Sequence, residues 1–401
     1  MSNITTLGQD LAQVDIATFA TKLTLDAVGE STFGHKFDAL EGGTDDLFRA
    51  NKRASAITQN LTEFGLLFRA IQRHMPLSVS TRLFTMFPTD EVRRLKAAGD
   101  TRRATARDIL MTAKQSGSAS REENKDILSV LIMIRKKQSS ACRMRKLLLK
   151  LRSVVRFWRQ YPWLNLFGRT IMQAGHHVTG VSMAWLFYDL ATHPEDQQRV
   201  FNELNALRTQ RGPGMELTAS DYDAMPYFNA VIKESLRLHS VAPLMIREAT
   251  FDDSIPLTTP VASTTGEEFS QIPVKKGQRV MLDFTSYHWL EDVWGTDAHT
   301  WNPSRFLDPE MKKNQVNVGV YSNLLIFSGG VQGCIGWRFA LMEIQTMLAA
   351  VLERFEISIP DGVEIQGVRT APVVPMVVGK LDDGMQVPVM MRRRGDTGGH
   401  S

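Results

Sequence analysis

The hydrophobic pattern near the end of the chain predicts one long amphipathic helix. Its apolar residues recur at steps of three and four, which places them on one helix face. They are Trp337, Leu341, Ile344, Leu348, Val351 and Phe355. A stretch from Phe327 to Gly336 comes directly before this helix and holds one cysteine, Cys334, among four glycines. The pattern therefore predicts that Cys334 lies just before a helix N-terminus.

Helical patterns also dominate the rest of the chain. Residues 1–40 are predicted to form a helix that ends near Gly29 and Gly34, because glycines commonly close helices. Residues 44–134 are mostly helical in pattern. Residues 170–192 have little polar face, which predicts a buried helix. Further helices are predicted over 195–207 and 228–239.

Extended segments are predicted in the C-terminal half. Residues 241–248 read as a strand, and residues 272–282 as a hairpin that turns at Lys-Lys-Gly. Residues 356–392 alternate short apolar runs with glycine and proline, which predicts small β-sheets. The polar tail, residues 393–401, is predicted to be disordered. The fold class is therefore mainly α with small β-sheets.

Composition narrows the class of protein. The 401 residues suffice for one large domain or two, and we expect a single domain over 1–401. A net charge of +4 is too small to suggest nucleic-acid binding. Two cysteines, Cys142 and Cys334, exclude a disulfide framework and a cysteine-rich metal site. The polar start, residues 1–15, predicts no signal peptide, and no nearby run is apolar enough to span a bilayer.

The segment 136–169 has an unusual charge pattern. No acidic residue lies between Asp126 and Asp189, and basic residues gather in the first half of that interval. One interpretation is a basic surface that contacts an acidic membrane or a redox partner. Another is an ordinary solvated face. A third, which the charge pattern favours, is that this segment is not native coding sequence.

The position of Cys334 suggests a metal ligand. Backbone N–H groups and the positive end of a helix dipole stabilise a thiolate, and glycines let the backbone approach a flat ligand closely. One anionic sulfur suits a metal whose other ligands are not protein, such as a haem iron. The alternative is a glycine loop with a buried, inert cysteine, which is common for free cysteines.

The loop resembles the haem-binding signature of cytochromes P450, Phe-x-x-Gly-x-Arg-x-Cys-x-Gly. The matching positions are Phe327, Gly330, Cys334 and Gly336. Gln332 stands where the family has an arginine that pairs with a haem propionate. The resemblance implies haem b as cofactor, with Cys334 as the axial ligand of its iron.

The buried helix 170–192 resembles the oxygen-activation segment of the same family. Gly175 is predicted to allow close approach of a ligand. His177 replaces the family's acid and Val178 replaces its first threonine, so that Thr179 keeps the only hydroxyl. Thr179 and His177 are therefore the candidates for proton delivery, since histidine titrates near neutral pH. The alternative for His176 and His177 is two satisfied histidines without a metal.

Three further matches follow in the family's order. Glu234 and Arg237 lie three residues apart on a predicted helix face, and Arg305 stands in a Pro-x-Arg-Phe segment. At this spacing a pair is ordinarily a weak surface ion pair, but the resemblance implies a buried structural network with Arg305. It also implies that Arg247 holds a haem propionate, with help from His239.

The resemblance covers about residues 16–394 and is closest to fungal, membrane-bound members of the family. It implies the cytochrome P450 fold without its N-terminal portion. The implied function is monooxygenation, in which one atom of O2 enters an apolar small molecule. NADPH would supply electrons through NADPH–cytochrome P450 reductase, and the protein would be a monomer. The implied location is the endoplasmic reticulum membrane surface; without a predicted anchor, a cytoplasmic location is the alternative.

Two other functions stay open. The substitutions at His177, Val178 and Gln332, with the expected loss of the N-terminal portion, predict impaired activity. An oxygen-independent rearrangement enzyme of P450 type would not need the acid and threonine pair. An inactive haem-binding or haem-less remnant is the non-enzyme alternative.

Overall fold

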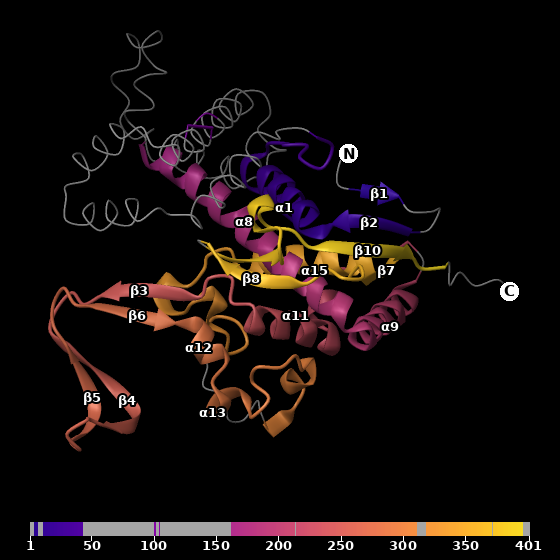
Figure 1. Ribbon diagram of the computed structural model, residues 1–401. Helices are drawn as coiled ribbons and strands as arrows, with labels where there is room; N and C mark the ends of the chain where they lie inside the picture. The colour runs from indigo at the N-terminus through magenta and orange to yellow at the C-terminus, as the bar shows by residue number, and fades with distance from the viewer. Residues whose placement is uncertain are drawn as a thin grey trace, which may run out of the picture.

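The computed structural model is mostly helical, with small antiparallel sheets (Figure 1). It describes residues 4–6, 11–42, 100, 101, 104, 162–212, 214–310, 318–370 and 372–395. Apart from three residues, the helices predicted over 44–134 lie outside this part of the chain. The basic segment 136–169 also lies outside it up to residue 161. The predicted mainly α fold with small β-sheets is confirmed.

Each of the longer helices overlaps a predicted helix, although the bounds differ. They are α1 (Ile16–Phe33), α8 (Pro162–Thr192), α9 (Pro194–Arg211), α11 (Pro226–Leu238) and α15 (Trp337–Leu352). Short helices are α10 (Ala219–Asp223), α12 (Phe284–His288) and α13 (Glu291–Trp294). Helix α9 begins at Pro194, whose missing N–H would be unsatisfied in a first turn anyway. Helix α15 ends before Phe355, which starts a strand instead.

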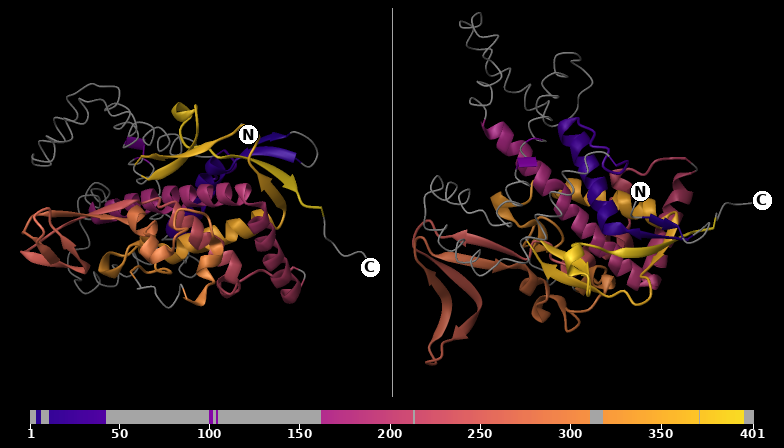
Figure 2. Two further views of the ribbon diagram at one scale, coloured as in Figure 1. Left: turned by 60° about the horizontal axis from the view of Figure 1, so that its bottom comes forward. Right: turned by 45° about the horizontal axis from the view of Figure 1, so that its top comes forward.

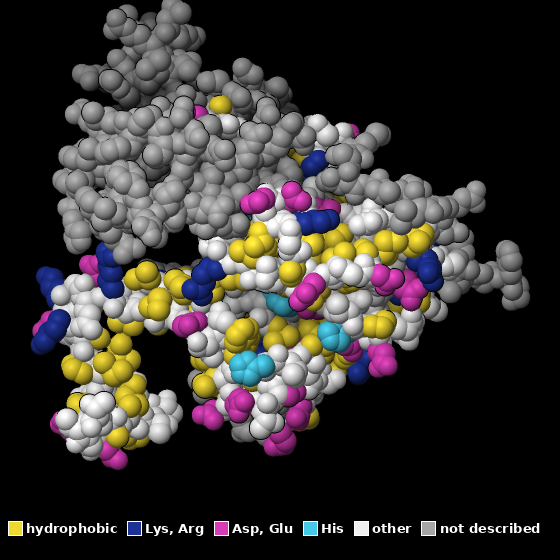
Figure 3. All heavy atoms as spheres, in the orientation of Figure 1, with side chains coloured by type: hydrophobic (Ala, Val, Ile, Leu, Met, Phe, Trp, Pro, Cys, Tyr) yellow, Lys and Arg dark blue, Asp and Glu magenta, His cyan; other side chains and the backbone are white. Residues whose placement is uncertain are grey.

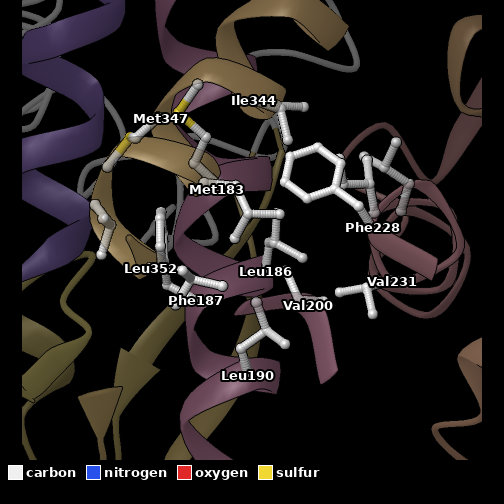
Figure 4. Close-up of a cluster of buried hydrophobic side chains, with 14 of the residues drawn as sticks. Met183, Leu186, Phe187, Leu190, Val200, Phe228, Val231, Ile344, Met347 and Leu352 are labelled. Carbon is white, nitrogen blue, oxygen red and sulfur yellow. The ribbon is translucent and has the colours of Figure 1, made fainter. Parts of the chain in front are cut away.

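The main hydrophobic core lies between α8, α9, α11 and α15 (Figure 4). Met183 and Leu186 of α8 contribute to it together with Phe228 of α11 and Ile344 of α15, and each is at most 2% exposed. Burying side chains of this size contributes about 1.5–3 kcal/mol each. This core fixes α15, and with it the direction in which the preceding cysteine loop enters.

Helix α1 crosses α8 at two glycines. A Cβ at Gly180 would lie 2.8 Å from the Cα of Thr21, and a Cβ at Gly175 would lie 3.1 Å from a methyl group of Val28. The hydroxyl of Thr24 donates a hydrogen bond of 2.8 Å to the carbonyl oxygen of His176. Small residues thus let the two backbones approach, and a side-chain hydrogen bond ties them together.

In the part of the chain that the structure describes, the strands form one four-stranded sheet and three two-stranded ones. The strands are β1 (Ile4–Thr6), β2 (Leu11–Asp15), β3 (Leu244–Glu248), β4 (Asp253–Ala262), β5 (Glu268–Val274), β6 (Arg279–Asp283), β7 (Phe355–Ser358), β8 (Ile365–Arg369), β9 (Val373–Val377) and β10 (Pro388–Arg393). The larger sheet has the order β1-β2-β10-β7, and the pairs are β3-β6, β4-β5 and β8-β9. All pairings that join these strands are antiparallel.

The predicted hairpin over 272–282 is wrong in its pairing. The chain does turn there, with Gly277 at a φ of +82°. However, β5 pairs with β4 and β6 pairs with β3, so the turn connects two different sheets. Local turn residues specify a reversal, whereas strand partners depend on contacts distant in sequence.

The two ends of the described chain lie in the same sheet. Strand β2 pairs with β10, so the predicted helix over 1–40 is preceded by strands and begins only at Ile16. That helix ends at Gly34 in a left-handed conformation, as predicted, whereas Gly29 lies inside it and makes room for Phe37. At the other end, strand β10 reaches Arg393, the first residue of the predicted tail.

The β3-β6 and β4-β5 strands extend from the helical body, as both views in Figure 2 show. Apolar side chains gather on this extension (Figure 3). Met281 and Val261 are among them, at 62% and 56% exposed. Within the described ranges, no helix has both the length and the apolar character to cross a bilayer.

Candidate active site

The cysteine loop runs from Phe327 to Cys334 and is closed by its own backbone. The N–H of Cys334 donates a hydrogen bond of 2.8 Å to the carbonyl oxygen of Phe327. Phe327 is buried, and Gly336 caps α15, which begins at Trp337. The prediction that Cys334 lies just before a helix N-terminus is confirmed.

Two positions of the loop require glycine, each for a different reason. Gly330 has a φ of +64°, a left-handed conformation that favours glycine. A Cβ at Gly329 would lie 2.8 Å from the carbonyl oxygen of Val318, so a side chain there would push two loop segments apart. The loop therefore keeps a narrow, tightly turned shape ahead of the helix.

The side chains around the thiol suit a large apolar ligand. Cys334 is exposed, which argues against the alternative of a buried, inert cysteine. Its neighbours Val331 and Ile335 are almost fully exposed, at 105% and 96%. Gly330 and Gly336 have open space where a Cβ would project. An exposed thiol among exposed apolar side chains and open glycines fits haem, which would cover them.

The two predicted propionate contacts lie in different surroundings. Arg247 is half-buried on β3, and its guanidinium donates only to the carbonyl oxygen of Ile246 among the described residues. His239 lies at the end of α11, where its Nε2 is 2.8 Å from Asp189 Oδ1 and its ring stacks on Trp185 at 4.0 Å. His239 is thus oriented by α8, whereas most Arg247 donors have no partner within the described ranges. Gln332 is exposed.

The predicted oxygen-activation segment lies in the middle of α8. Thr179 is 5% exposed, and its hydroxyl donates a hydrogen bond of 3.1 Å to the carbonyl oxygen of Gly175. His177 is half-buried and Val178 is exposed. The Cβ direction of Gly175 faces α1, so the close approach seen at this glycine is between helices. No hydrogen bond between described residues joins Thr179 to Cys334.

The structure brings Glu234, Arg237 and Arg305 together in the interior. Glu234 and Arg237 are fully buried, and two hydrogen bonds of 2.8 Å join them side by side. Arg305 donates to the same carboxylate at 3.1 Å and also to Asp297 at 3.0 Å. Because the remaining arginine donors reach backbone carbonyls of residues 288–300, this network fastens that segment to α11.

A buried histidine that the sequence pattern does not single out lies next to this network. His288 is 0% exposed, and its carbonyl oxygen accepts a hydrogen bond of 2.6 Å from Arg237. Its ring contacts Ser240 through Nδ1 and the backbone N–H of Leu325 through Nε2. Burial, and secondarily the charge of Arg237, lower the pKa of His288 to about 3. The ring is therefore neutral at physiological pH.

Glu343 is a second group that sequence reasoning missed. It lies on α15, and both of its carboxyl oxygens are buried with no hydrogen-bond partner among the described residues. Burial raises the pKa of Glu343 to about 9. The available signal was an acidic residue between Met342 and Ile344 in an otherwise apolar stretch. An amphipathic helix ordinarily tolerates such a residue on its polar face, so the pattern does not distinguish it.

Comparisons with known proteins agree with these motifs. A cytochrome P450 monooxygenase of Postia placenta, number 205, is 28% identical over 390 residues, which cover 95% of this chain and 67% of that protein. The ganoderic acid synthetase CYP5150L8 of Ganoderma lucidum is also 28% identical, over 88% of this chain and 64% of its own. The chain thus spans about two thirds of the length of these relatives.

The fold has a counterpart among solved structures. The crystal structure of the cytochrome P450 CYP102L1 superimposes with a TM-score of 0.63 at 21% sequence identity. It covers 95% of this chain and 69% of that one. The sequence pattern that describes cytochrome P450 matches residues 164–380, more than half of this chain. The chain therefore belongs to the cytochrome P450 family.

Proposed function

We propose that this protein is a haem-thiolate monooxygenase that inserts one oxygen atom from O2 into an apolar small molecule. The observation that carries the proposal is the exposed Cys334 side chain at the end of a closed glycine loop, directly before α15. The monooxygenase names of the relatives support the reaction class. When bound, haem supplies the redox chemistry by which O2 is activated.

The chain's own groups have separate parts in holding the cofactor. Cys334 would provide the sulfur ligand, and the exposed Val331 and Ile335 would lose contact with water when the porphyrin binds. Among the described residues the Arg247 guanidinium donates only to the Ile246 carbonyl, so it would have further donors for a propionate. His239 uses Nε2 on Asp189, so only its Nδ1 remains for a second polar contact. Gln332 offers a neutral amide where the family has a charge.

Proton handling would fall to the middle of α8. The proton on Thr179 Oγ1 is directed at the Gly175 carbonyl, so this oxygen offers lone pairs to a substrate or water and donates only after rotation. His177 is the nearest titratable side chain in sequence, and histidine can exchange a proton near neutral pH. Val178 offers no polar atom. With so few groups to deliver protons, we expect a smaller share of the supplied electrons to end in oxidised product.

The remaining parts of the proposal come from family membership. Electrons would come from NADPH through NADPH–cytochrome P450 reductase, and the site of action would be the surface of the endoplasmic reticulum membrane. We expect the protein to act as a monomer. The substrate is proposed only as a class, an apolar small molecule.

A second candidate is a rearrangement enzyme that consumes a hydroperoxide without NADPH. Two features favour this candidate: the Thr179 hydroxyl already donates its proton to the Gly175 carbonyl, and position 177 holds no acid. The rearrangement needs no proton delivery to O2, so it would not depend on either group. Turnover of a hydroperoxide in the absence of reductase, with no product from O2 in its presence, would select this candidate.

The test of the haem proposal compares Cys334→Ala with Cys142→Ala. The chain has two cysteines, so the second variant is a matched control. We expect the wild type and Cys142→Ala to give the thiolate-type carbon monoxide difference spectrum, and Cys334→Ala to lose it. A bound colour and spectrum that survive in Cys334→Ala would refute the proposal.

A further inference from the structure

The hydrogen bonds of His288 fix which ring nitrogen carries its proton. The backbone N–H of Leu325 donates to Nε2 over 2.9 Å, so Nε2 must be the acceptor. In a neutral ring the proton then lies on Nδ1, which is 2.7 Å from the hydroxyl oxygen of Ser240. Nδ1 therefore donates to Ser240. The low pKa of His288 agrees with a ring that stays neutral.

Leu325 connects this ring to the cysteine loop. It starts a 3₁₀ turn, Leu325–Phe327, and its carbonyl oxygen accepts the N–H of Ser328 at 2.7 Å. The last residue of the turn, Phe327, accepts the N–H of Cys334. Three hydrogen bonds thus lead from the imidazole to the backbone of the cysteine. Ser328 has a φ of +56°, so the turn holds a conformation that a non-glycine residue rarely adopts.

The other side of His288 is anchored independently. Arg237 binds its carbonyl oxygen and also binds Glu234, so the backbone at position 288 is fixed to α11. Ser240 follows the end of the same helix and is 3% exposed. The imidazole therefore spans the space between a rigid helix end and the start of the cysteine loop. The Leu325 N–H is half-buried, so loss of its acceptor would destabilise this conformation of the turn.

We propose that His288 is a positioning residue that sets the conformation of the loop Leu325–Cys334 through its Nε2 lone pair. The role of that loop in haem binding rests on the function proposed above, but the hydrogen-bond relay does not. His288 touches neither the thiol nor any reacting atom in this arrangement, and acts through Leu325 and Phe327.

Three variants separate this role from packing. His288→Gln places an amide oxygen near the position of Nε2 and can still accept from Leu325. His288→Asn reaches only the position of Nδ1 and keeps the Ser240 contact. His288→Phe keeps the ring volume and neither hydrogen bond. If the hydrogen bond to Leu325 positions the loop, only His288→Gln should preserve the loop conformation. If the ring acts only by packing, His288→Phe should be tolerated best.

The first readout needs no haem. Hydrogen exchange, resolved at the Leu325 amide, should be about tenfold faster in His288→Asn and His288→Phe than in wild type and His288→Gln. In a Cys142→Ala background, iodoacetamide reports Cys334 alone, and its alkylation rate should separate the variants into the same two groups. Equal exchange in all four proteins, or slow exchange in His288→Phe alone, would overturn the inference.

The second readout is the carbon monoxide difference spectrum of the haem-loaded proteins. We expect the thiolate form to dominate in wild type and His288→Gln, and the fraction without thiolate ligation to rise in the other two variants. A wild type without any haem spectrum would refute the proposed function. The exchange and alkylation rates would still decide the role of His288, so the two failures are distinguishable.

Discussion

Replacing Glu343 with glutamine should remove a pH-dependent loss of stability. Both carboxyl oxygens are buried with no hydrogen-bond partner in the described part of the chain, and burial raises the pKa of this group from a reference value of 4.5 to about 9. The native state therefore keeps a proton that the unfolded chain releases above pH 4.5. Since the native state binds more protons than the unfolded state, stability falls as pH rises through this interval.

The magnitude follows from the two pKa values. Each pH unit between them costs about 1.4 kcal/mol, so at pH 7 the loss relative to pH 4.5 is about 3 kcal/mol. Above pH 9 the native carboxyl ionises and the loss stops growing. Glutamine has a similar shape and no titration, so Glu343→Gln should show none of this slope.

Urea unfolding followed by circular dichroism between pH 5 and 8 measures the effect. The control is Glu216→Gln, because Glu216 is exposed. We expect the unfolding free energies of the wild type and Glu216→Gln to change in parallel with pH. Relative to both, the unfolding free energy of Glu343→Gln should increase by about 1.4 kcal/mol per pH unit. Parallel curves for all three proteins would show that the carboxyl is hydrated and ionised in the native state, and would refute the reasoning.

Two further predictions concern the scaffold. Gly180→Ala should lower the unfolding free energy by about 1–3 kcal/mol because its Cβ would meet the backbone of Thr21 at 2.8 Å. Gly175→Ala should cost less, because its Cβ would meet a Val28 methyl group at 3.1 Å and no backbone atom. Equal thermal shifts for the two variants would contradict this. Glu234→Ala should cost about 3–5 kcal/mol in urea unfolding, because two buried arginines lose their shared carboxylate. Glu248→Ala, which removes only the exposed ion pair with Arg279, should leave unfolding nearly unchanged; a similar loss in both variants would count against the buried network.

The glycine motif correctly placed Cys334 before a helix N-terminus, and apolar periodicity located the longer helices. Phe327 and Cys334 could be singled out from the sequence, because phenylalanine, glycines and cysteine follow one another at a fixed spacing directly before an amphipathic helix. The buried pairing of Glu234 with Arg237 needed the family resemblance, since spacing alone indicates a surface pair. Phe355 could not be assigned, because an apolar residue at helical spacing fits a following strand equally well.

The amino-acid sequence by itself determined the local features of the structure. Apolar spacing specified the long helices, and glycines with proline specified where the chain reverses, because both act through neighbouring residues. Tertiary structure alone decided the partners: which strand pairs with β5, which helix Gly180 approaches, and that His288 links α11 to the cysteine loop. These depend on contacts between residues tens of positions apart, where the burial of polar groups selects one arrangement among many compatible with the local pattern.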